Sequence, residues 1–270
     1  MSEKKIPIAL TIAGSDSGGG AGIQADLKTF SALGAYGASV ITAVTAQNTS
    51  EVRAIHPIPV EIINQQINAV FDDLKVDVVK TGMLGDAQTV ACVADCLSRY
   101  KSVPFVLDPV MVAKSGDALL LQSAVDMLKT RLIPLASLIT PNLPEASVLL
   151  GCGEPTSLEQ METMAQQLMG LGAGAVLLKG GHLESSDNAT DLFYDGQQMV
   201  SLSSPRIATQ NTHGTGCTLA SAIAAGLADG LNTLAAIKQA KDYIDAAIAA
   251  ADDLQVGQGH GPVHHFYKYW

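Results

Sequence analysis

Short apolar runs alternate with longer amphipathic segments along most of this chain. The short runs have the length and residue types of strands, and they span residues 8–13, 36–46, 76–81, 105–108, 138–140 and 175–179. The segments between them place apolar residues three and four positions apart, which predicts helices over 23–33, 59–74, 87–100, 117–132, 143–150 and 157–171. This alternation is typical of βαβ units, whose right-handed crossovers build a mostly parallel sheet.

The pattern changes after residue 179. Two short apolar runs, 191–194 and 199–202, flank Asp195-Gly196, a pair that favours a β-hairpin turn. Helical periodicity then returns over 216–228 and 233–253. Because no linker, charge block or internal repeat divides the chain, we predict a single α/β domain over residues 1–270, with helices on both faces of the sheet.

The composition narrows the possible functions. The chain has 270 residues, of which 47% are hydrophobic, so it can bury an ordinary core without disulfides or a structural metal. Its net charge is −10 and only 4% of its residues are aromatic. Excess negative charge repels nucleic acids and anionic membrane surfaces, so we expect the partners to be small molecules.

The cysteines and the N-terminal segment indicate a compartment. Cys92, Cys96, Cys152 and Cys217 lack the paired spacing of zinc sites, which favours reduced thiols. The apolar stretch 6–12 is too short for a secretory signal or a membrane span. We therefore expect a cytoplasmic protein.

Candidate chemistry should follow the strands, because ligands bind beyond the carboxyl ends of strands in open α/β sheets. The first such segment, 14–22, reads GSDSGGGAG. No Gly-Lys-Ser/Thr follows, so it is not a P-loop, and Ile23 stands where a dinucleotide fingerprint needs its third glycine. Small residues let a planar ligand approach the backbone, so we interpret this loop as a substrate contact, with a flexible turn as the alternative.

The most distinctive motif is NTHGTGCT, residues 211–218. Gly214 and Gly216 precede an apolar helix, whose first turn offers unpaired N–H groups to an anion such as phosphate. A turn that needs positive φ would also select glycine. Cys217 would lie at this helix N-terminus, where the helix dipole favours its thiolate.

Two carboxylates and a lysine are placed where a nucleotide phosphate would need them. Asp108 and Glu145 follow predicted strands, and Mg²⁺ bound to phosphates is usually held by one or two carboxylates. As alternatives, Glu145 could simply stabilise a helix dipole and Asn142 could be a helix N-cap. Lys179 ends the most apolar strand and would bring a cation to the phosphates, unless it only extends from the strand end to solvent.

Seven motifs follow one another in a distinctive order. They are residues 13–26 (AGSDSGGGAGIQAD), 45–49 (TAQNT), 80–84 (KTGML), 107–111 (LDPVM), 140–146 (TPNLPEA), 178–182 (LKGGH) and 213–218 (HGTGCT). Together they resemble the hydroxymethylpyrimidine/phosphomethylpyrimidine kinases of thiamine biosynthesis, within the ribokinase-like superfamily that also contains pyridoxal kinases. The resemblance extends over essentially the whole chain and implies a ribokinase-like three-layer α/β/α sandwich.

The resemblance also implies an ATP-dependent reaction. The γ-phosphoryl group would pass to a 5-hydroxymethyl group on an aminopyrimidine, and a second one to the resulting monophosphate. Gln47 would hydrogen-bond the pyrimidine ring, in a pocket shaped by Gly14, Asp26, Met83 and Val110.

The remaining motif residues would handle phosphate and metal. By the same resemblance, Asp108, Asn142 and Glu145 would manage Mg²⁺ and phosphates, Lys179 would contact the nucleotide, and Gly214, Thr215 and Gly216 would form the anion hole. The wider superfamily usually has an aspartate base where this chain has Cys217, as the pyrimidine kinases do. We hypothesise that Cys217 orients the substrate hydroxyl and takes its proton.

Other functions stay open at this point. A pyridoxal kinase would also accept a planar ring with a hydroxymethyl arm, although an amide such as Gln47 suits an aminopyrimidine edge. A non-catalytic binding protein would not need the phosphate-handling residues, and the missing third glycine disfavours a dehydrogenase.

Adjacent His264 and His265 lack a spaced carboxylate partner and do not indicate a metal site. The resemblance further implies a homodimer that buries an edge of the sheet.

Overall fold

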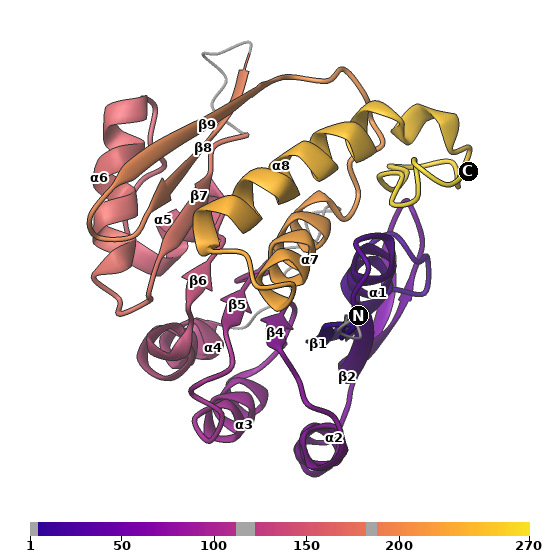
Figure 1. Ribbon diagram of the computed structural model, residues 1–270, viewed down its shortest axis with the longest axis vertical. Helices are drawn as coiled ribbons and strands as arrows, with labels where there is room; N and C mark the ends of the chain where they lie inside the picture. The colour runs from indigo at the N-terminus through magenta and orange to yellow at the C-terminus, as the bar shows by residue number, and fades with distance from the viewer. Residues whose placement is uncertain (1–4, 112–121, 182–187) are drawn as a thin grey trace.

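Residues 5–111, 122–181 and 188–270 are described in the computed structural model of the chain (Figure 1). Their nine strands form one sheet in the order β3-β2-β1-β4-β5-β6-β7-β8-β9. The strands are β1 (Ile8–Ser15), β2 (Tyr36–Gln47), β3 (Val52–Pro57), β4 (Val78–Thr81), β5 (Phe105–Leu107), β6 (Leu138–Ile139), β7 (Val176–Lys179), β8 (Asn188–Tyr194) and β9 (Met199–Pro205). Strands β2, β1, β4, β5, β6 and β7 are parallel, whereas β3, β8 and β9 pair antiparallel with their neighbours.

Helices cover both faces of the sheet. They are α1 (Gly22–Ala32), α2 (Val60–Asp73), α3 (Ala87–Leu97), α4 (Gln122–Met127), α5 (Leu143–Leu150), α6 (Leu158–Met169), α7 (Thr215–Ala228) and α8 (Thr233–Ala249). Helices α1, α7 and α8 lie on one side of the sheet and α2 to α6 on the other (Figure 1). This arrangement confirms the predicted three-layer α/β/α sandwich with a mostly parallel central sheet.

Alternate side chains of the central strands enter two separate cores. On β1, Leu10 and Ile12 pack with α2 to α6, while Ala9 packs on the side of α1, α7 and α8. On β5, Leu107 likewise packs with α2 to α6, and Val106 packs on the side of α1, α7 and α8. Successive side chains of a strand point to opposite faces, so a strand buried on both sides needs apolar side chains on both faces, apart from buried polar groups that find partners. This is why the parallel strands appear in the sequence as continuous apolar runs.

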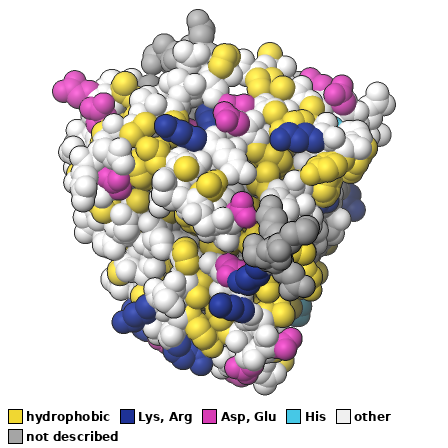
Figure 2. Space-filling model, viewed as in Figure 1, with side chains coloured by type: hydrophobic (Ala, Val, Ile, Leu, Met, Phe, Trp, Pro, Cys, Tyr) yellow, Lys and Arg dark blue, Asp and Glu magenta, His cyan; other side chains and the backbone are white. Residues whose placement is uncertain are grey.

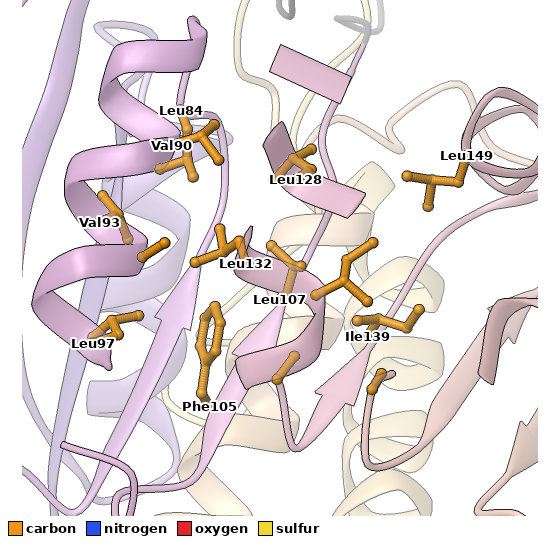
Figure 3. Packing of buried hydrophobic residues seen from close by; sticks show 14 of the residues in the cluster. Leu84, Val90, Val93, Leu97, Phe105, Leu107, Leu128, Leu132, Ile139 and Leu149 are labelled. Carbon is orange, nitrogen blue, oxygen red and sulfur yellow. The ribbon is translucent and has the colours of Figure 1, made fainter. Parts of the chain in front are cut away.

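Figure 3 shows part of the larger core. Val90, Val93 and Leu97 project from α3 toward Phe105 and Leu107 of β5, and side chains from the segments around α4, β6 and α5 complete the cluster. Each of the five named side chains is at most 6% exposed. Burial of such side chains contributes about 1.5–3 kcal/mol each, so this core fixes the positions of the strand ends that carry the site.

Four helices begin at a side-chain cap that the sequence supplies. The side chains of Asp86, Asn142, Ser157 and Asn232 accept hydrogen bonds from the backbone N–H three residues later, at the starts of α3, α5, α6 and α8. Each cap pairs one of the N–H groups that a helix start leaves free, which stabilises it by about 1 kcal/mol. The caps explain why these helices begin close to the predicted positions.

Besides shifts of up to three residues at the ends of other elements, three segments differ from the prediction. Strand β3 was not predicted, because nearly all its side chains are exposed and its sequence, VRAIHP, has no apolar face. The described part of the helix predicted over 117–132 is α4 followed by a π-helical turn, Leu128–Leu132, and its predicted start lies outside the described residues. The helix predicted over 233–253 ends at Ala249, and a 3₁₀ turn, Ala251–Asp253, follows it.

The face of the molecule in Figure 2 carries Lys and Arg side chains interspersed with Asp and Glu and with apolar areas. Among the described residues, no helix combines the length and the apolar character needed to cross a membrane.

Candidate active site

A cavity of about 810 Å³ opens at the carboxyl ends of the parallel strands. Its lining includes Gly14, Gln47, Met83, Asp108, Val110, Asn142, Glu145, Lys179, Gly214, Thr215, Gly216 and Cys217. The sheet therefore brings together predicted site residues from seven segments that are far apart in the chain. Asp26 is different: it has no exposed surface and lies beneath the cavity floor.

Asp108 and Lys179 form a largely buried ion pair at one wall of the cavity. The Lys179 ammonium lies 3.0 Å from Asp108 Oδ1, which also accepts a hydrogen bond from the Thr140 hydroxyl at 3.2 Å. Burial lowers the pKa of Lys179, but Asp108 and Glu145 outweigh it, and the pKa is raised overall. The lysine is thus a permanent cation facing the cavity.

Glu145 belongs to a capping box at the start of α5. Its Oε2 accepts from the Asn142 N–H at 2.8 Å, and its own N–H donates to Asn142 Oδ1 at 2.8 Å. The two capping alternatives considered from the sequence are therefore present, and both residues also line the cavity. Burial raises the pKa of Glu145 to about 7, against the effect of Lys179 and with a further rise caused by the Asp108 carboxylate.

This raised pKa predicts a pH-dependent stability. The ordinary pKa is 4.5, so between pH 4.5 and about 7 the folded protein keeps a proton that the unfolded chain has lost. The free energy of unfolding should fall across this window, by at most about 3 kcal/mol. Glu145→Gln retains the capping oxygen but cannot ionise. In metal-free urea titrations, we expect the free energy of unfolding of Glu145→Gln to match that of the wild type at pH 4.5 and to exceed it by up to about 3 kcal/mol at pH 8. A difference between the two proteins that does not change with pH would contradict this prediction.

The turn before α7 depends on two glycines. Gly214 has φ of 80°, and a Cβ there would lie 1.9 Å from the Gly20 carbonyl oxygen. A Cβ on Gly216 would lie 3.3 Å from Lys179 Nζ and 3.7 Å from Asp108 Oδ2. The turn therefore places the first N–H groups of α7 against the Asp108–Lys179 pair. A helix N-terminus beside a cation is a site for a phosphate group.

Cys217 does not have the ionisation that we predicted from its helix position. Burial raises the pKa of its thiol to about 11, against the lowering effect of Lys80 and with further rises from Asp26 and Asp108. The favourable helix dipole is outweighed because removing a thiolate from water costs more than the first turn of a helix restores. At neutral pH the free protein therefore carries a neutral thiol here.

A buried ion pair lies under the cavity floor. Lys80 Nζ is 2.8 Å from Asp26 Oδ1, and both side chains are fully buried. The Asp26 carboxylate also accepts from the hydroxyls of Thr11 and Ser221, each at 2.6 Å. Asp26 therefore has no direct contact with the cavity, contrary to the role we predicted for it. A Cβ on Gly82, which lines the cavity, would lie 3.1 Å from Lys80 Nζ.

The glycine-rich loop joins β1 to α1 and lies beside the end of β2. The Ser17 hydroxyl donates to the Gln47 carbonyl oxygen at 2.7 Å and accepts from the Gln47 N–H at 2.8 Å. The Thr45 hydroxyl donates to the Ser15 carbonyl oxygen at 2.8 Å. These bonds fix the backbone of Gln47, a residue that lines the cavity.

Comparison with known proteins identifies the family. A family model described as phosphomethylpyrimidine kinase matches residues 16–264. The chain belongs to this family. It is 57% identical, over 97% of its length and 98% of the other, to a hydroxymethylpyrimidine/phosphomethylpyrimidine kinase of Rhizobium meliloti. Two crystal structures are similar to this chain. One is an ADP complex of Bacillus subtilis pyridoxal kinase, with a TM-score of 0.89 and 39% identity, over 97% of this chain and 98% of that one. The other is a phosphomethylpyrimidine kinase of Clostridium difficile, with a TM-score of 0.80 and 44% identity, over 90% of this chain and 100% of that one. The resemblance, fold class and kinase activity inferred from the motifs are thereby confirmed.

One end of this kinase's cavity was not predicted from the sequence. Lys241 of α8 lies 3.0 Å from Asp191 Oδ2 and 3.7 Å from Asp245 Oδ1, and all three residues line the cavity. Ile207 and Ile244 give this end an apolar lining. The i,i+4 spacing of Lys241 and Asp245 was visible in the sequence, but nothing there related α8 to the strand ends, because the approach depends on the hairpin β8–β9.

The two tail histidines of the kinase are buried away from this chemistry. His264 and His265 are each 4% exposed. His265 Nε2 lies 3.0 Å from the Thr218 hydroxyl, and burial lowers the pKa of His265 to about 3. The described residues contain no group of three or more His, Cys, Asp or Glu placed to hold a metal ion.

Proposed function

We propose that this kinase transfers the γ-phosphoryl group of ATP to the hydroxymethyl group of 4-amino-5-hydroxymethyl-2-methylpyrimidine, and a second one to the resulting monophosphate. One observation carries the proposal. The Asp108–Lys179 pair and the first turn of α7 meet at one wall of the cavity, with Gln47 and the apolar lining around Ile207 and Ile244 also facing it. Such a cavity has room for an acceptor, a phosphate chain and a nucleoside.

The pyrimidine would lie at the end lined by Gly14, Gln47, Met83 and Val110. A Cβ on Gly14 would lie 2.4 Å from the Met83 methyl carbon, so glycine lets Met83 form a flat wall there. The Gln47 amide can both donate to a ring nitrogen and accept from the adjacent amino group. This pairing supports an aminopyrimidine as the acceptor.

The nucleotide would extend from the anion-binding turn to the apolar end. The similarity to a kinase solved with ADP supports a nucleotide as one of the ligands. Lys179 and the N–H groups of Gly214 and Gly216 would hold the phosphate oxygens, next to Thr215, whose N–H donates to the Thr212 carbonyl oxygen at 3.3 Å. They would also stabilise the charge that spreads over the transferred group in a loose transition state.

Magnesium fits the same wall. Asp108 and Glu145 both line the cavity, and the repulsion between their carboxylates contributes to the raised pKa of Glu145. A divalent cation between them would relieve this repulsion. One or two carboxylates are the usual protein share of a magnesium site on nucleotide phosphates. When bound, the ion would neutralise phosphate charge. Asn142 would keep Glu145 in place through the capping box.

Cys217 would orient the hydroxyl of the acceptor. Since the free thiol is neutral, it would act first as a hydrogen-bonding partner of that hydroxyl. A loose transition state asks little of a base, so the hydroxyl proton can leave late in the reaction.

An assay of ADP release tests the substrate assignment. Wild-type protein with Mg-ATP should turn over both the pyrimidine alcohol and its monophosphate. Gln47→Ala should raise KM for the pyrimidine about tenfold or more, because a buried amide pair is lost, and should leave KM for ATP nearly unchanged. An equal effect on both constants would contradict the placement of the pyrimidine.

Pyridoxal is a second candidate acceptor, favoured by the similarity to Bacillus subtilis pyridoxal kinase. The same assay with pyridoxal and pyridoxine decides it. Preference for pyridoxal over both pyrimidines would assign the enzyme to vitamin B6 salvage.

The enzyme would act as a homodimer in the cytoplasm. Strand β3 is an edge strand exposed along its length, and Val44 of β2 and Ile55 of β3 are 46% and 40% exposed, so an open edge remains to be covered. The four free cysteines favour a reducing compartment. Light scattering after size exclusion should give twice the mass of one chain, and a monomer at micromolar concentration would contradict the dimer.

A further inference from the structure

A buried contact joins the glycine-rich loop to the turn before α7. The Asp16 carboxylate is 2% exposed, and its Oδ2 lies 2.8 Å from His213 Nε2. The same carboxylate accepts from the N–H groups of Gly18, Gly20 and Ala21 at 2.8, 3.0 and 2.8 Å. Burial raises the pKa of Asp16, but the hydrogen bonds from His213 and from the loop backbone lower it further than burial raises it. The Asp16 carboxylate is therefore ionised and accepts hydrogen bonds from both loops.

The backbones of these loops also fit into each other. A Cβ on Gly20 would lie 2.4 Å from His213 Cδ2, and a Cβ on Gly214 would lie 1.9 Å from the Gly20 carbonyl oxygen. Neither position can accept a side chain without moving the other loop. The Asp16–His213 bond therefore lies within an interlocked contact whose geometry leaves little freedom.

The tail holds His213 from its other side. The His213 N–H donates to the Gly261 carbonyl oxygen at 3.0 Å, and the Val263 N–H donates to the His213 carbonyl oxygen at 3.3 Å. Figure 1 shows this C-terminal segment, in yellow, next to the indigo loops above α1. His213 is thus fixed along its backbone by the tail and at its ring by Asp16.

The two loops lie beside the two reactants of the proposed transfer, the acceptor alcohol and the phosphoryl group. Gly14 and Gly22 of the first loop line the cavity, as do Gly214 and Gly216 of the second. The first loop lies beside Gln47, where the acceptor is proposed, and the second holds the transferred phosphoryl group. In-line transfer needs the hydroxyl oxygen and the phosphorus close together and aligned, and an error of about 1 Å can cost about 100-fold in rate.

We propose that Asp16 and His213 are positioning residues that set the distance and angle between the acceptor alcohol and the transferred phosphoryl group. Neither residue needs to exchange a proton with the substrate for this role. The inference rests on the placement of acceptor and phosphates proposed above.

Variants of His213 test the role. In His213→Leu, we expect kcat to fall about 100-fold while KM for the pyrimidine and for ATP stays within about threefold, because each loop still binds its own ligand. His213→Gln places an amide N–H near the position of Nε2 and should restore kcat to within about tenfold of the wild type. His213→Asn, whose amide is too short to reach Asp16, should behave like the leucine variant and serves if that variant does not fold.

A double-mutant cycle separates positioning from two independent effects. Asp16→Asn combined with His213→Leu should lower kcat no further than the more damaging single change, because both remove one contact. Asp77→Asn is the matched control: Asp77 accepts from Lys5 at 2.7 Å and from the Ile8 N–H at 2.9 Å, near the start of β1. It should change the melting temperature without changing kcat.

Several outcomes would overturn the proposal. They are a loss of activity in His213→Leu that lies wholly in KM, a glutamine variant as slow as the leucine variant, or additive losses in the double variant. Gln47→Ala is measured in the same series. If that change leaves KM for the pyrimidine unaltered, the proposed placement fails, whatever the His213 variants show.

Discussion

Lys179→Met should lower kcat by about 1000-fold, the largest effect on activity that we expect from a single change. The ammonium lies 3.0 Å from Asp108 and next to Gly216, and it is the cation that the cavity wall holds beside the first turn of α7. A preorganised charge in a site shielded from water stabilises the transition state by about 3–4 kcal/mol. Initial rates of ADP release with both substrates saturating would measure the loss.

Two further variants test whether the loss of kcat in Lys179→Met comes from the loss of this particular charge. Lys5→Met removes a lysine whose ion pair with Asp77, at 2.7 Å, is largely exposed, and it should leave kcat unchanged. Cys217→Ala should lower kcat by about tenfold to 100-fold without a matching rise in KM, because it removes an orienting group and no charge. A Lys179→Met enzyme with more than about a tenth of the wild-type kcat would show that charge neutralisation at this position is not required.

Lys80→Met should destabilise the fold by about 3–5 kcal/mol, the largest effect on stability that we expect. The change leaves the Asp26 carboxylate fully buried without its cation, although the hydroxyls of Thr11 and Ser221 still donate to it. Folded domains are stable by about 5–15 kcal/mol, so much of this reserve would be lost. Urea unfolding followed by circular dichroism measures the difference.

The double variant Asp26→Asn/Lys80→Met is the matched control. It removes both charges, so most of the lost stability should return, because replacing a whole buried pair is far less costly than breaking one. A double variant as unstable as Lys80→Met would mean that packing of the lysine chain, and not the unpaired charge, carries the effect.

The arrangement of the layers was predictable from the sequence. Runs such as 175–178 are apolar at every position because this part of β7 is buried on both faces, and capping residues such as Asn142 and Ser157 mark helix starts locally. Strand β3 was not predictable in this way. Its side chains are mostly exposed, and it owes its strand conformation to pairing with β2, which the local pattern of VRAIHP does not encode.

The site divides along the same line. The order of seven motifs identified the family. Twelve of the thirteen predicted site residues, Asp108, Lys179 and Gly216 among them, line the cavity because parallel strands end at one edge of the sheet, and the exception is Asp26. For Cys217, the position was predicted but the ionisation was not. Its thiol faces buried carboxylates and is raised in pKa to about 11. Solvent exposure and neighbouring charges set that value, and neither is a property of the local sequence.

The sequence by itself determined the alternation of strands and helices, the capped helix starts and the family, because period, cap and motif are properties of residues close together in the chain. Only the tertiary structure decided that Asp26 lies beneath the cavity, that Lys241 reaches it from α8, and that Asp16 meets His213. Each of these contacts joins residues at least 50 positions apart. Such contacts depend on the packing of whole layers, which fixes distance and burial together, and a one-dimensional pattern carries neither quantity.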